Sequence, residues 1–426
     1  TTEIYTLSLH DALPISMIKI RSFIFASGKL VTGLIIYLSL KLTPMHYNQI
    51  MEISLLPAPV WVNTPSSFTH LVHDLSTQPR LAIDTESNSL YAYQERVCLI
   101  QFSTASTDYL LDPFALSDLS ALAPIFSNPQ IEKVFHASEY DIICLRRDYQ
   151  FSFTNIFDTM QAARILGRPA VGLGSILEAE FGLKVNKRYQ RADWGVRPIP
   201  PEMLNYARLD THYLLPLRDR LAEALQAAGL WQLALEEFER LCNPAIPASE
   251  NGNARILNSR ELNARQNTVL HELCHYRDQQ ARRLNVPPFK VLSNDMLIEI
   301  AQHCPQTPTA LETLVHLPAR LRSRHGEQIL RAVQKGLSAP LAQRPSATPR
   351  PDEAYLMRAE KLREWRKQAA QKMGVESDII LPRETLEAIA SANPQTMHEL
   401  AQVMGKLTWR LEHYGQEILN TLHSKE

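Results

Sequence analysis

The second half of this 426-residue chain repeats itself, because many positions 89 residues apart carry the same residue along an alignment without gaps. The repeat begins where Arg277 aligns with Arg366 and ends where Ile329-Leu330 aligns with Ile418-Leu419. Two copies of so long a period are too few for a solenoid. We therefore expect two tandem all-helical domains, at residues 261–340 and 353–426, joined by a Pro-, Ala- and Ser-rich linker at 341–352. Further identical pairs are Ala281 with Ala370, Val286 with Val375, Leu292 with Leu381, Leu297 with Leu386, Ile300 with Ile389, Pro305 with Pro394, Thr307 with Thr396 and Gly326 with Gly415.

Length and composition indicate a globular protein with several domains. The chain is too long for one ordinary domain, and roughly two to four are expected. The formal net charge is −1, so any binding of nucleic acid must depend on local basic patches. The five cysteines are scattered and form no Cys-x-x-Cys pair. This pattern favours buried thiols, a reducing compartment and a cytoplasmic location over a disulfide framework.

Residues 1–54 do not read like the rest of the chain. Residues 8–15 resemble the translation of a sequencing-adapter oligonucleotide, so we interpret this extension as a translation artefact. The apolar run that follows imitates a signal peptide, but Lys29 interrupts it and leaves fewer uncharged residues than the roughly 20 that a spanning helix needs. We expect no membrane association. Translation is expected to begin near Met45 or Met51 rather than at Met17.

Between residues 55 and 228, short apolar strands come first and then alternate with helical segments. This order is typical of an α/β domain with a mixed central sheet. Ser66 and Ser67 are expected to cap the first helix, and Pro200 or Pro201 to open the last. Strands are expected at 60–62, 81–86, 97–102, 109–112 and 133–136, the second to fourth forming a meander, and helices at 68–75, 116–126, 139–147, 158–166, 173–181 and 202–227. A further helix at 231–240 and a linker are expected within 229–260.

The strand at 81–86 ends in two carboxylates, Asp84 and Glu86. Because side chains alternate between the two faces of a strand, both acids leave the same side and their charges repel each other. A divalent cation is one way to compensate this repulsion, and exposure of both acids to water is the other.

Two further features supply acids from distant parts of the chain. Asp141 lies 55 residues beyond Glu86, and Tyr206-Ala-Arg-Leu-Asp210 places a phenol and a carboxylate on one helix face. Each feature alone is more often part of a solvated surface. In combination with Asp84 and Glu86, they resemble the DEDD family of 3′→5′ exonucleases, and specifically its tyrosine-bearing subgroup.

The surrounding sequence is similar to ribonuclease D within that family. The similar segments are Phe157-Asp-Thr159, Gly167-Arg-Pro169 and Asp193-Trp194, and the resemblance covers residues 58–225. Each copy of the repeat resembles an HRDC domain, a small helical module found after such nucleases. The resemblance implies an α/β ribonuclease H-like exonuclease domain at residues 55–228, followed by two HRDC domains.

The resemblance also implies the roles of the site residues. Asp84 would bridge two divalent cations, Glu86 and Asp210 would bind one of them, and Asp141 would help to hold the other. Tyr206 would orient the attacking water. Phosphodiester hydrolysis needs an activated water and neutralisation of charge on the phosphate. Four acids without a ligating Cys or His pair also favour Mg²⁺ or Mn²⁺ over zinc.

Several neighbouring residues have both a structural and a functional interpretation. Glu139 is a rival to Asp141 as a ligand, and Asp158 is expected to cap a helix. Gln101 could contact a nucleotide or be a buried amide with its hydrogen bonds satisfied. His136 is expected to be structural, and His212 to be partly exposed on the last helix. The remaining candidates are Trp194, expected in the core, and the basic loop of Lys187, Arg188 and Arg191, which could bind phosphates.

We therefore expect a 3′→5′ exoribonuclease that releases nucleoside 5′-monophosphates and, as the resemblance implies, trims 3′ ends of precursor tRNA and other structured RNA. A DNA-directed exonuclease and a non-catalytic RNA-binding scaffold stay open as alternatives, although no Gly-x-x-x-x-Gly-Lys-Ser/Thr loop is present to power strand separation. No obligate protein partner is expected. The resemblance to HRDC domains implies that the two copies contact nucleic acid or the nuclease. Their basic residues are Arg282, Arg283, Arg320, Arg322 and Arg324 in the first copy and Lys361, Arg363, Arg366, Lys367 and Lys372 in the second.

Overall fold

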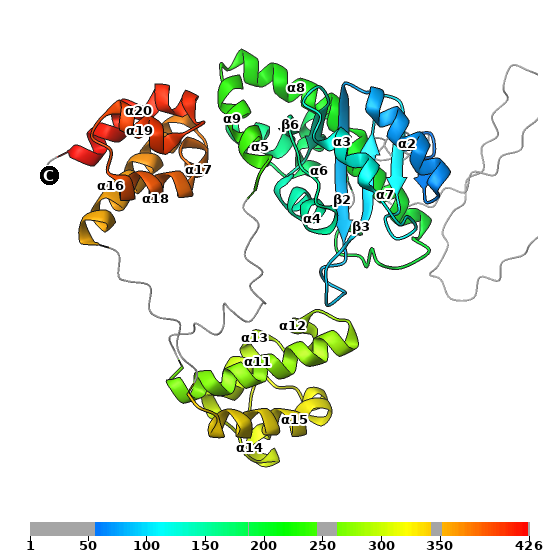
Figure 1. Ribbon diagram of the computed structural model, residues 1–426, viewed down its shortest axis with the longest axis vertical. Helices are drawn as coiled ribbons and strands as arrows, with labels where there is room; N and C mark the ends of the chain where they lie inside the picture. The colour runs from blue at the N-terminus through cyan, green and yellow to red at the C-terminus, as the bar shows by residue number, and fades with distance from the viewer. Residues whose placement is uncertain (1–55, 186, 245–261, 342–351, 425–426) are drawn as a thin grey trace, which may run out of the picture. The chain divides into compact units, whose positions relative to one another are not determined.

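The computed structural model describes residues 56–185, 187–244, 262–341 and 352–424 (Figure 1). The extension expected at residues 1–54 lies outside the described residues, as do most of both expected linkers. Within the described residues, no helix is both long enough and apolar enough to cross a bilayer.

The first half of the chain is built on a six-stranded mixed sheet with the strand order β1-β4-β3-β2-β5-β6. The expected meander is present, because β3 pairs antiparallel with both β2 and β4. The three remaining pairings, β1 with β4, β2 with β5 and β5 with β6, are parallel. The strands are β1 (Val60–Val62), β2 (Arg80–Ser87), β3 (Val97–Ser103), β4 (Asp108–Leu111), β5 (Glu132–Phe135) and β6 (Ile156–Asp158), of which β6 was not expected.

Successive side chains of a strand point to opposite faces of this sheet, and each face packs into its own apolar cluster. Leu81, Ile83 and Phe102 belong to one apolar cluster with residues of α2 (Pro65–Thr77), α3 (Ala123–Phe126) and α4 (Glu139–Tyr149). Ala82 belongs to a second cluster, formed with α5 (Thr159–Ile165), α6 (Leu173–Phe181), α8 (Leu214–Ala227) and α9 (Trp231–Leu241). Asp84 shares the face of Ala82, and α7 (Pro201–His212) packs over this face. The mixed sheet between helices confirms the expected α/β fold class.

Three helix starts or lengths differ from expectation. Helix α2 begins earlier than expected, because Thr64 rather than Ser66 is its N-cap and forms a capping box with Ser67. The helix expected at 116–126 is reduced to a 3₁₀ turn at Ser120–Leu122 followed by the short α3. The helix expected to start at Asp158 begins one residue later, because Asp158 caps it instead, as the capping hypothesis predicted.

The long helix expected at 202–227 is two helices, α7 and α8, separated at Tyr213. The cause is Pro216, which lies in the first turn of α8. A proline ring has no N–H to donate and clashes with the carbonyl four residues earlier, here that of His212. The change of direction lets α7 cover β2, β3 and β4 while α8 packs against α5 and β5.

The second half forms two helical domains whose elements start 89 residues apart, as the repeat predicted (Figure 1). Each has its own apolar core. In the first, Gly336 lets two helices approach closely, because an added Cβ would lie 2.5 Å from Cα of Val269. The helices are α11 (Ala264–Leu284), α12 (Pro288–Val291), α13 (Asn294–His303), α14 (Pro308–Glu312) and α15 (Ala319–Ser338), then α16 (Glu353–Met373), α17 (Ser377–Ile380), α18 (Arg383–Ala392), α19 (Met397–Met404) and α20 (Thr408–His423).

Arg410 of α20 makes a buried ionic contact with α9. Its guanidinium has no solvent exposure, and it donates to Glu236 at 2.8 Å and to Glu237 at 2.5 Å. Removing one member of such a group would leave an uncompensated buried charge, which costs about 3–5 kcal/mol. The position 89 residues earlier holds Leu321, so this contact belongs to the second helical domain alone.

Candidate active site

Asp84 and Glu86 lie at the end of β2 and point to the same face of the sheet. The pKa of Asp84 is raised well above its usual value, chiefly by burial and then by the charges of Asp141, Asp210 and Glu86. The pKa of Glu86 is raised by burial and then by Asp210 and Asp141. The two acids of the strand therefore share one electrostatic environment with acids from two distant helices.

Asp141 comes to this site in the first turn of α4. Oγ1 of Thr85 donates a hydrogen bond of 2.5 Å to its Oδ1. Burial raises the pKa of Asp141 to about 7, against the lowering effect of the hydrogen bond from Thr85. A residue next to Asp84 on the strand thus fixes the carboxylate of the helix.

Tyr206 and Asp210 lie one turn apart on α7. Burial raises the pKa of Asp210 to about 7. The ring of Tyr206 contacts Tyr189 edge-on, at 5.9 Å between ring centroids, and Trp194 at 6.2 Å. Burial, then the charges of Asp210, Glu86 and Asp84, raise the pKa of Tyr206, so its phenol keeps its proton across the physiological range.

The structure thus brings together all five residues that the sequence pattern singled out. Asp84, Glu86 and Asp210 retain partial exposure to solvent, yet protein atoms surround them closely enough for burial to dominate each pKa. Among the described residues, no group of three or more His, Cys, Asp or Glu side chains is already arranged to hold a metal ion. The carboxylates are therefore near enough to repel one another without converging on one point.

Two observations test whether divalent cations fit these residues. The first is the donor set, because four carboxylates whose pKa values are all raised offer oxygen donors that suit hard cations such as Mg²⁺ or Mn²⁺. The second is Gln101, which has no solvent exposure and lies opposite Asp84 in the pairing of β2 with β3. Neither its Nε2 nor its Oε1 has a hydrogen-bond partner. Of the two interpretations of Gln101, the one with a satisfied amide is therefore wrong, and a hydrated cation at Asp84 would give the amide partners.

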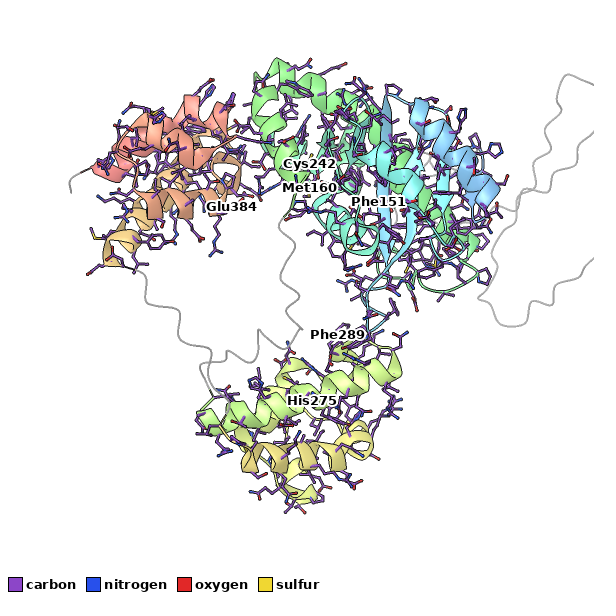
Figure 2. The ribbon with its side chains drawn as sticks, viewed as in Figure 1. Phe151, Met160, Cys242, His275, Phe289 and Glu384 are labelled. Atoms are coloured by element: carbon purple, nitrogen blue, oxygen red, sulfur yellow. The ribbon has the colours of Figure 1, made fainter. Side chains whose placement is uncertain are left out.

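Glu139, the rival to Asp141, lies elsewhere. It lines a separate pocket of about 330 Å³ with Asp158 and with Met160, which Figure 2 marks. It does not contribute to the raised pKa of Asp84, whereas Asp141 does. Asp158 accepts hydrogen bonds from backbone N–H groups of both α5 and the turn before α4, so its carboxylate serves as a cap. The geometry favours Asp141 over Glu139 as a member of the site.

The two histidines have hydrogen-bonded positions. Nδ1 of His136 lies 2.9 Å from Oγ1 of Thr159, and burial lowers its pKa because the charged form is poorly solvated there. Nδ1 of His212 lies 2.9 Å from Oδ2 of Asp108, and its side chain is partly exposed. The first position is consistent with the structural role expected for His136, and the second with the partial exposure expected for His212.

The basic loop before α7 lies beside the site. Lys187, Arg188 and Arg191 are exposed, and the neighbouring Tyr189 is the ring that meets Tyr206. Trp194 anchors this loop in the core with 1% exposure, as expected.

Three contributors were not found by sequence reasoning. Thr85 lies between Asp84 and Glu86 in the sequence. Its role is seen only in the structure, where its hydroxyl donates to Asp141. Arg197 holds the basic loop to the sheet by donating to both carboxylate oxygens of Asp112 at 2.8 Å and to the carbonyl of Cys98 at 2.6 Å. Tyr189 had no signal beyond its place among basic residues.

Comparison with protein families agrees with this geometry. Residues 59–226 match the family model described as 3′-5′ exonuclease, and residues 266–333 and 356–422 each match the HRDC domain. The chain therefore has a 3′-5′ exonuclease domain of the DEDD type followed by two HRDC domains, and the resemblance expected from the sequence is confirmed.

The relatives are exoribonucleases of the RRP6 and ribonuclease D type. The exosome complex exonuclease RRP6 of Saccharomyces cerevisiae is 34% identical over 265 residues, which are 58% of this chain and 36% of that protein. The catalytic core of RRP6 from Trypanosoma brucei is similar in structure, with a TM-score of 0.58, 29% identity and coverage of 68% of this chain and 82% of that one. Escherichia coli RNase D, at 24% identity and a TM-score of 0.64 over 85% of this chain and 98% of that one, shares the fold. The chain spans about a third of the length of the curated relatives that it matches.

Proposed function

We propose that this protein is a 3′→5′ exoribonuclease that uses two divalent cations, Mg²⁺ or Mn²⁺, to release nucleoside 5′-monophosphates from RNA. The observation that carries the proposal is the charge repulsion at Asp84 from acids of the same strand and of two helices. The charges of Asp141, Asp210 and Glu86 all raise the pKa of Asp84. Such mutual repulsion has no structural benefit, and cation binding would compensate it.

The carboxylates of Asp84, Glu86, Asp141 and Asp210 would hold the cations. When bound, the cations supply an activated water and neutralise charge on the phosphodiester. Thr85 keeps Asp141 in position by its hydrogen bond. Tyr206 stays protonated, so it acts as a hydrogen-bond donor that orients the attacking water rather than as a base.

RNA is the proposed substrate class because Escherichia coli RNase D, which shares the fold, is named an exoribonuclease. The exposed Lys187, Arg188 and Arg191 would contact backbone phosphates close to Tyr206. These contacts carry no sequence information, which suits an enzyme that removes successive nucleotides. We further propose precursor tRNA and other structured RNA as substrates whose 3′ ends are trimmed.

Partners and cellular location are proposed on other grounds than the geometry of the site. The Saccharomyces cerevisiae relative is named as an exosome complex exonuclease, so an assembly with other proteins is a testable alternative to the expected independence. The cytoplasmic location expected from the cysteine pattern stays a prediction. Fractionation of the native protein by size, followed by identification of co-eluting chains, would test the partner, and subcellular fractionation would test the compartment.

The decisive experiment offers the purified protein two labelled substrates in one tube. A 3′-extended tRNA and a DNA of the same sequence compete in Mg²⁺, in Mn²⁺ and in EDTA, and the products are resolved by length. We expect stepwise shortening of the RNA with release of mononucleotides, and no shortening in EDTA. Faster shortening of the DNA would support the DNA-directed exonuclease. No release under any condition would leave the non-catalytic scaffold.

A further inference from the structure

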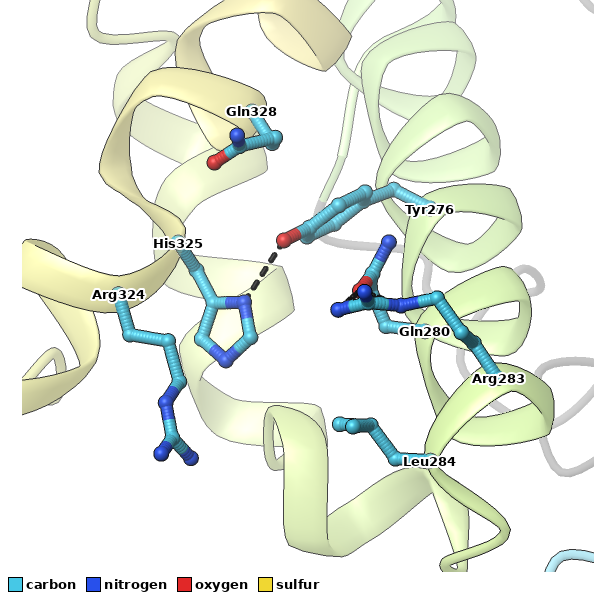
Figure 3. Close-up of a pocket in the computed structure, with 7 residues that line it drawn as sticks. All are labelled: Tyr276, Gln280, Arg283, Leu284, Arg324, His325 and Gln328. Atoms are coloured by element: carbon cyan, nitrogen blue, oxygen red, sulfur yellow. Dashed lines mark hydrogen bonds between the residues drawn. The ribbon is translucent and has the colours of Figure 1, made fainter.

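The first HRDC domain contains a pocket that the nuclease reaction does not use. Its volume is about 520 Å³, and it lies between α11 and α15 (Figure 3). This volume is in the range of cavities that hold a small molecule or one nucleotide, about 300–1,000 Å³. The lining residues are Tyr276, Gln280, Arg283, Leu284, Arg324, His325 and Gln328.

The lining of the pocket is positively charged and contains no acid. Arg283 comes from α11 and Arg324 from α15, so a guanidinium is present on each wall (Figure 3). Gln280 accepts from Nη2 of Arg283 at 2.9 Å and holds it in place. Burial and the charges of Arg324 and Arg283 lower the pKa of His325, which shows the positive field inside the pocket. An anionic ligand would relieve this field.

A buried imidazole and a phenol form a second recognition element. His325 is 4% exposed, and its Nδ1 lies 2.7 Å from the phenolic oxygen of Tyr276. The two rings meet edge-on at 6.0 Å. A neutral imidazole that accepts the phenolic hydrogen at Nδ1 carries its own hydrogen on Nε2. Among the described contacts of His325, none uses Nε2, so this N–H is available to a ligand.

The second HRDC domain provides an internal comparison, because its residues 89 positions further along have different chemistry. Trp365 and Tyr414 replace the phenol and imidazole pair and also meet edge-on, at 5.8 Å. Nε1 of Trp365 donates to Glu417, an acid where the first domain has a glutamine, and the hydroxyl of Tyr414 donates to Sδ of Met373. The groups at these positions of the second domain therefore bond to Glu417 and Met373, whereas in the first domain the phenol and the imidazole bond to each other beside two arginines.

We propose that the pocket of the first HRDC domain binds one nucleotide of a single-stranded RNA segment. The phosphate would lie between Arg283 and Arg324, whose guanidinium groups suit phosphate oxygens. The base would lie against the ring of Tyr276 and Leu284, with the amide of Gln328 within reach of its edge. Unstacked bases of single-stranded RNA are recognised in this way, by aromatic contact and by hydrogen bonds to their edges. This proposal depends on the proposed action on RNA.

The test measures binding of the full chain to a labelled single-stranded oligoribonucleotide in EDTA, where no hydrolysis is expected. The pocket variant is Arg283→Ala with Arg324→Ala, and the matched control is Arg320→Ala with Arg331→Ala, two exposed arginines of α15 outside the pocket. We expect the pocket variant to bind at least about tenfold more weakly and its salt slope to fall by about 1.4, and the control to change by less than about threefold. Tyr276→Ala should weaken binding by about tenfold, through lost contact with the base.

A dinucleotide serves as a second substrate, because its hydrolysis in Mg²⁺ reports on the carboxylate site alone. Wild-type cleavage of the dinucleotide by the pocket variant, together with weakened RNA binding, would support the proposal and show that the variant is folded. Unchanged RNA binding by the pocket variant would overturn the pocket and leave the nuclease function standing. Equal binding of a DNA of the same sequence, or binding of an acidic peptide in place of RNA, would also overturn it. Failure of the wild type to cleave the dinucleotide would instead contradict the proposed function.

Discussion

Asp84 and Gln101 lie directly opposite each other on neighbouring antiparallel strands, so their side chains leave the same face of the sheet. The Gln101 amide is completely buried and has no partner for either polar atom. An unsatisfied buried polar group costs about 1–3 kcal/mol. The unsatisfied amide of Gln101, which is paired with Asp84 across the strands, therefore lowers the stability of the fold at this site.

The first prediction concerns Gln101→Leu. We expect the free energy of unfolding to rise by about 1–3 kcal/mol, because the unsatisfied amide is removed, and the rate of RNA hydrolysis to fall. Urea unfolding and a hydrolysis assay would measure the two effects. Gln161→Leu is the matched control, because this buried glutamine accepts from Arg164 at 2.9 Å and its loss should lower stability. Lower stability with unchanged hydrolysis in Gln101→Leu would make this residue purely structural.

The second prediction concerns the central acid. Asp84→Asn should reduce hydrolysis at least about a hundredfold, because it removes a carboxylate that is proposed to hold the cations. Without cations, the variant should be more stable than the wild type by about 1 kcal/mol or more, because asparagine carries no charge for burial and the neighbouring acids to disfavour. Added Mn²⁺ should raise the melting temperature of the wild type and not that of the variant. Equal stabilisation of both proteins by Mn²⁺ would contradict the assignment of Asp84.

The third prediction tests the contact between Thr85 and Asp141. Thr85→Val keeps the shape of the side chain and removes the hydroxyl that donates to the carboxylate. We expect the Mg²⁺ concentration for half-maximal hydrolysis to rise by about 10–100-fold, as is usual when a residue that orients a ligand is lost. Thr85→Ser restores the hydroxyl and should recover most of the affinity. A serine variant as weak as the valine variant would assign the effect to packing.

The fourth prediction concerns the phenol of Tyr206. Tyr206→Phe should slow hydrolysis by about a hundredfold while leaving Mg²⁺ affinity nearly unchanged, because only the hydroxyl is lost and the ring still packs on Tyr189 and Trp194. Because the pKa of Tyr206 is raised, its phenol stays protonated near pH 10. The pH–rate profiles of the wild type and of the phenylalanine variant should therefore have the same shape around that pH. An equal rate for both proteins would remove the phenol from the mechanism.

The fifth prediction is a pH dependence of stability at Lys133, which lies on β5 away from the carboxylates. Burial lowers its pKa to about 8, although Nζ donates to the carbonyls of Asn128 and Ile131. Between about pH 8 and 10.5 the unfolded chain binds a proton that the folded chain does not, so the contribution of Lys133 to stability rises with pH.

Lys133→Met is the comparison that isolates this effect, because other groups titrate in the same range. The stability of the wild type relative to the variant should increase by about 1–3 kcal/mol between pH 8 and 10.5. Urea unfolding of both proteins at several pH values measures the difference. A constant difference across this range would show that the pKa of Lys133 is not lowered in the folded protein.

The sequence alone determined those features that depend on a few consecutive residues. Asp84 and Glu86 share a face because strands alternate, and Tyr206 and Asp210 share one because helices repeat every 3.6 residues. The 89-residue repeat likewise determined two domains of the same helical order, and the matching helices start 89 residues apart. Backbone geometry sets these relations locally, so they survive any arrangement of the rest of the chain.

Only the tertiary structure decided how distant elements meet. It placed Thr85 against Asp141, buried Gln101 opposite Asp84, and separated α7 from α8 so that Asp210 reaches the sheet. It also placed Arg283 and Arg324 on facing walls of one pocket. These distances depend on how whole apolar faces pack, and a packed core is set by many residues together rather than by any local pattern.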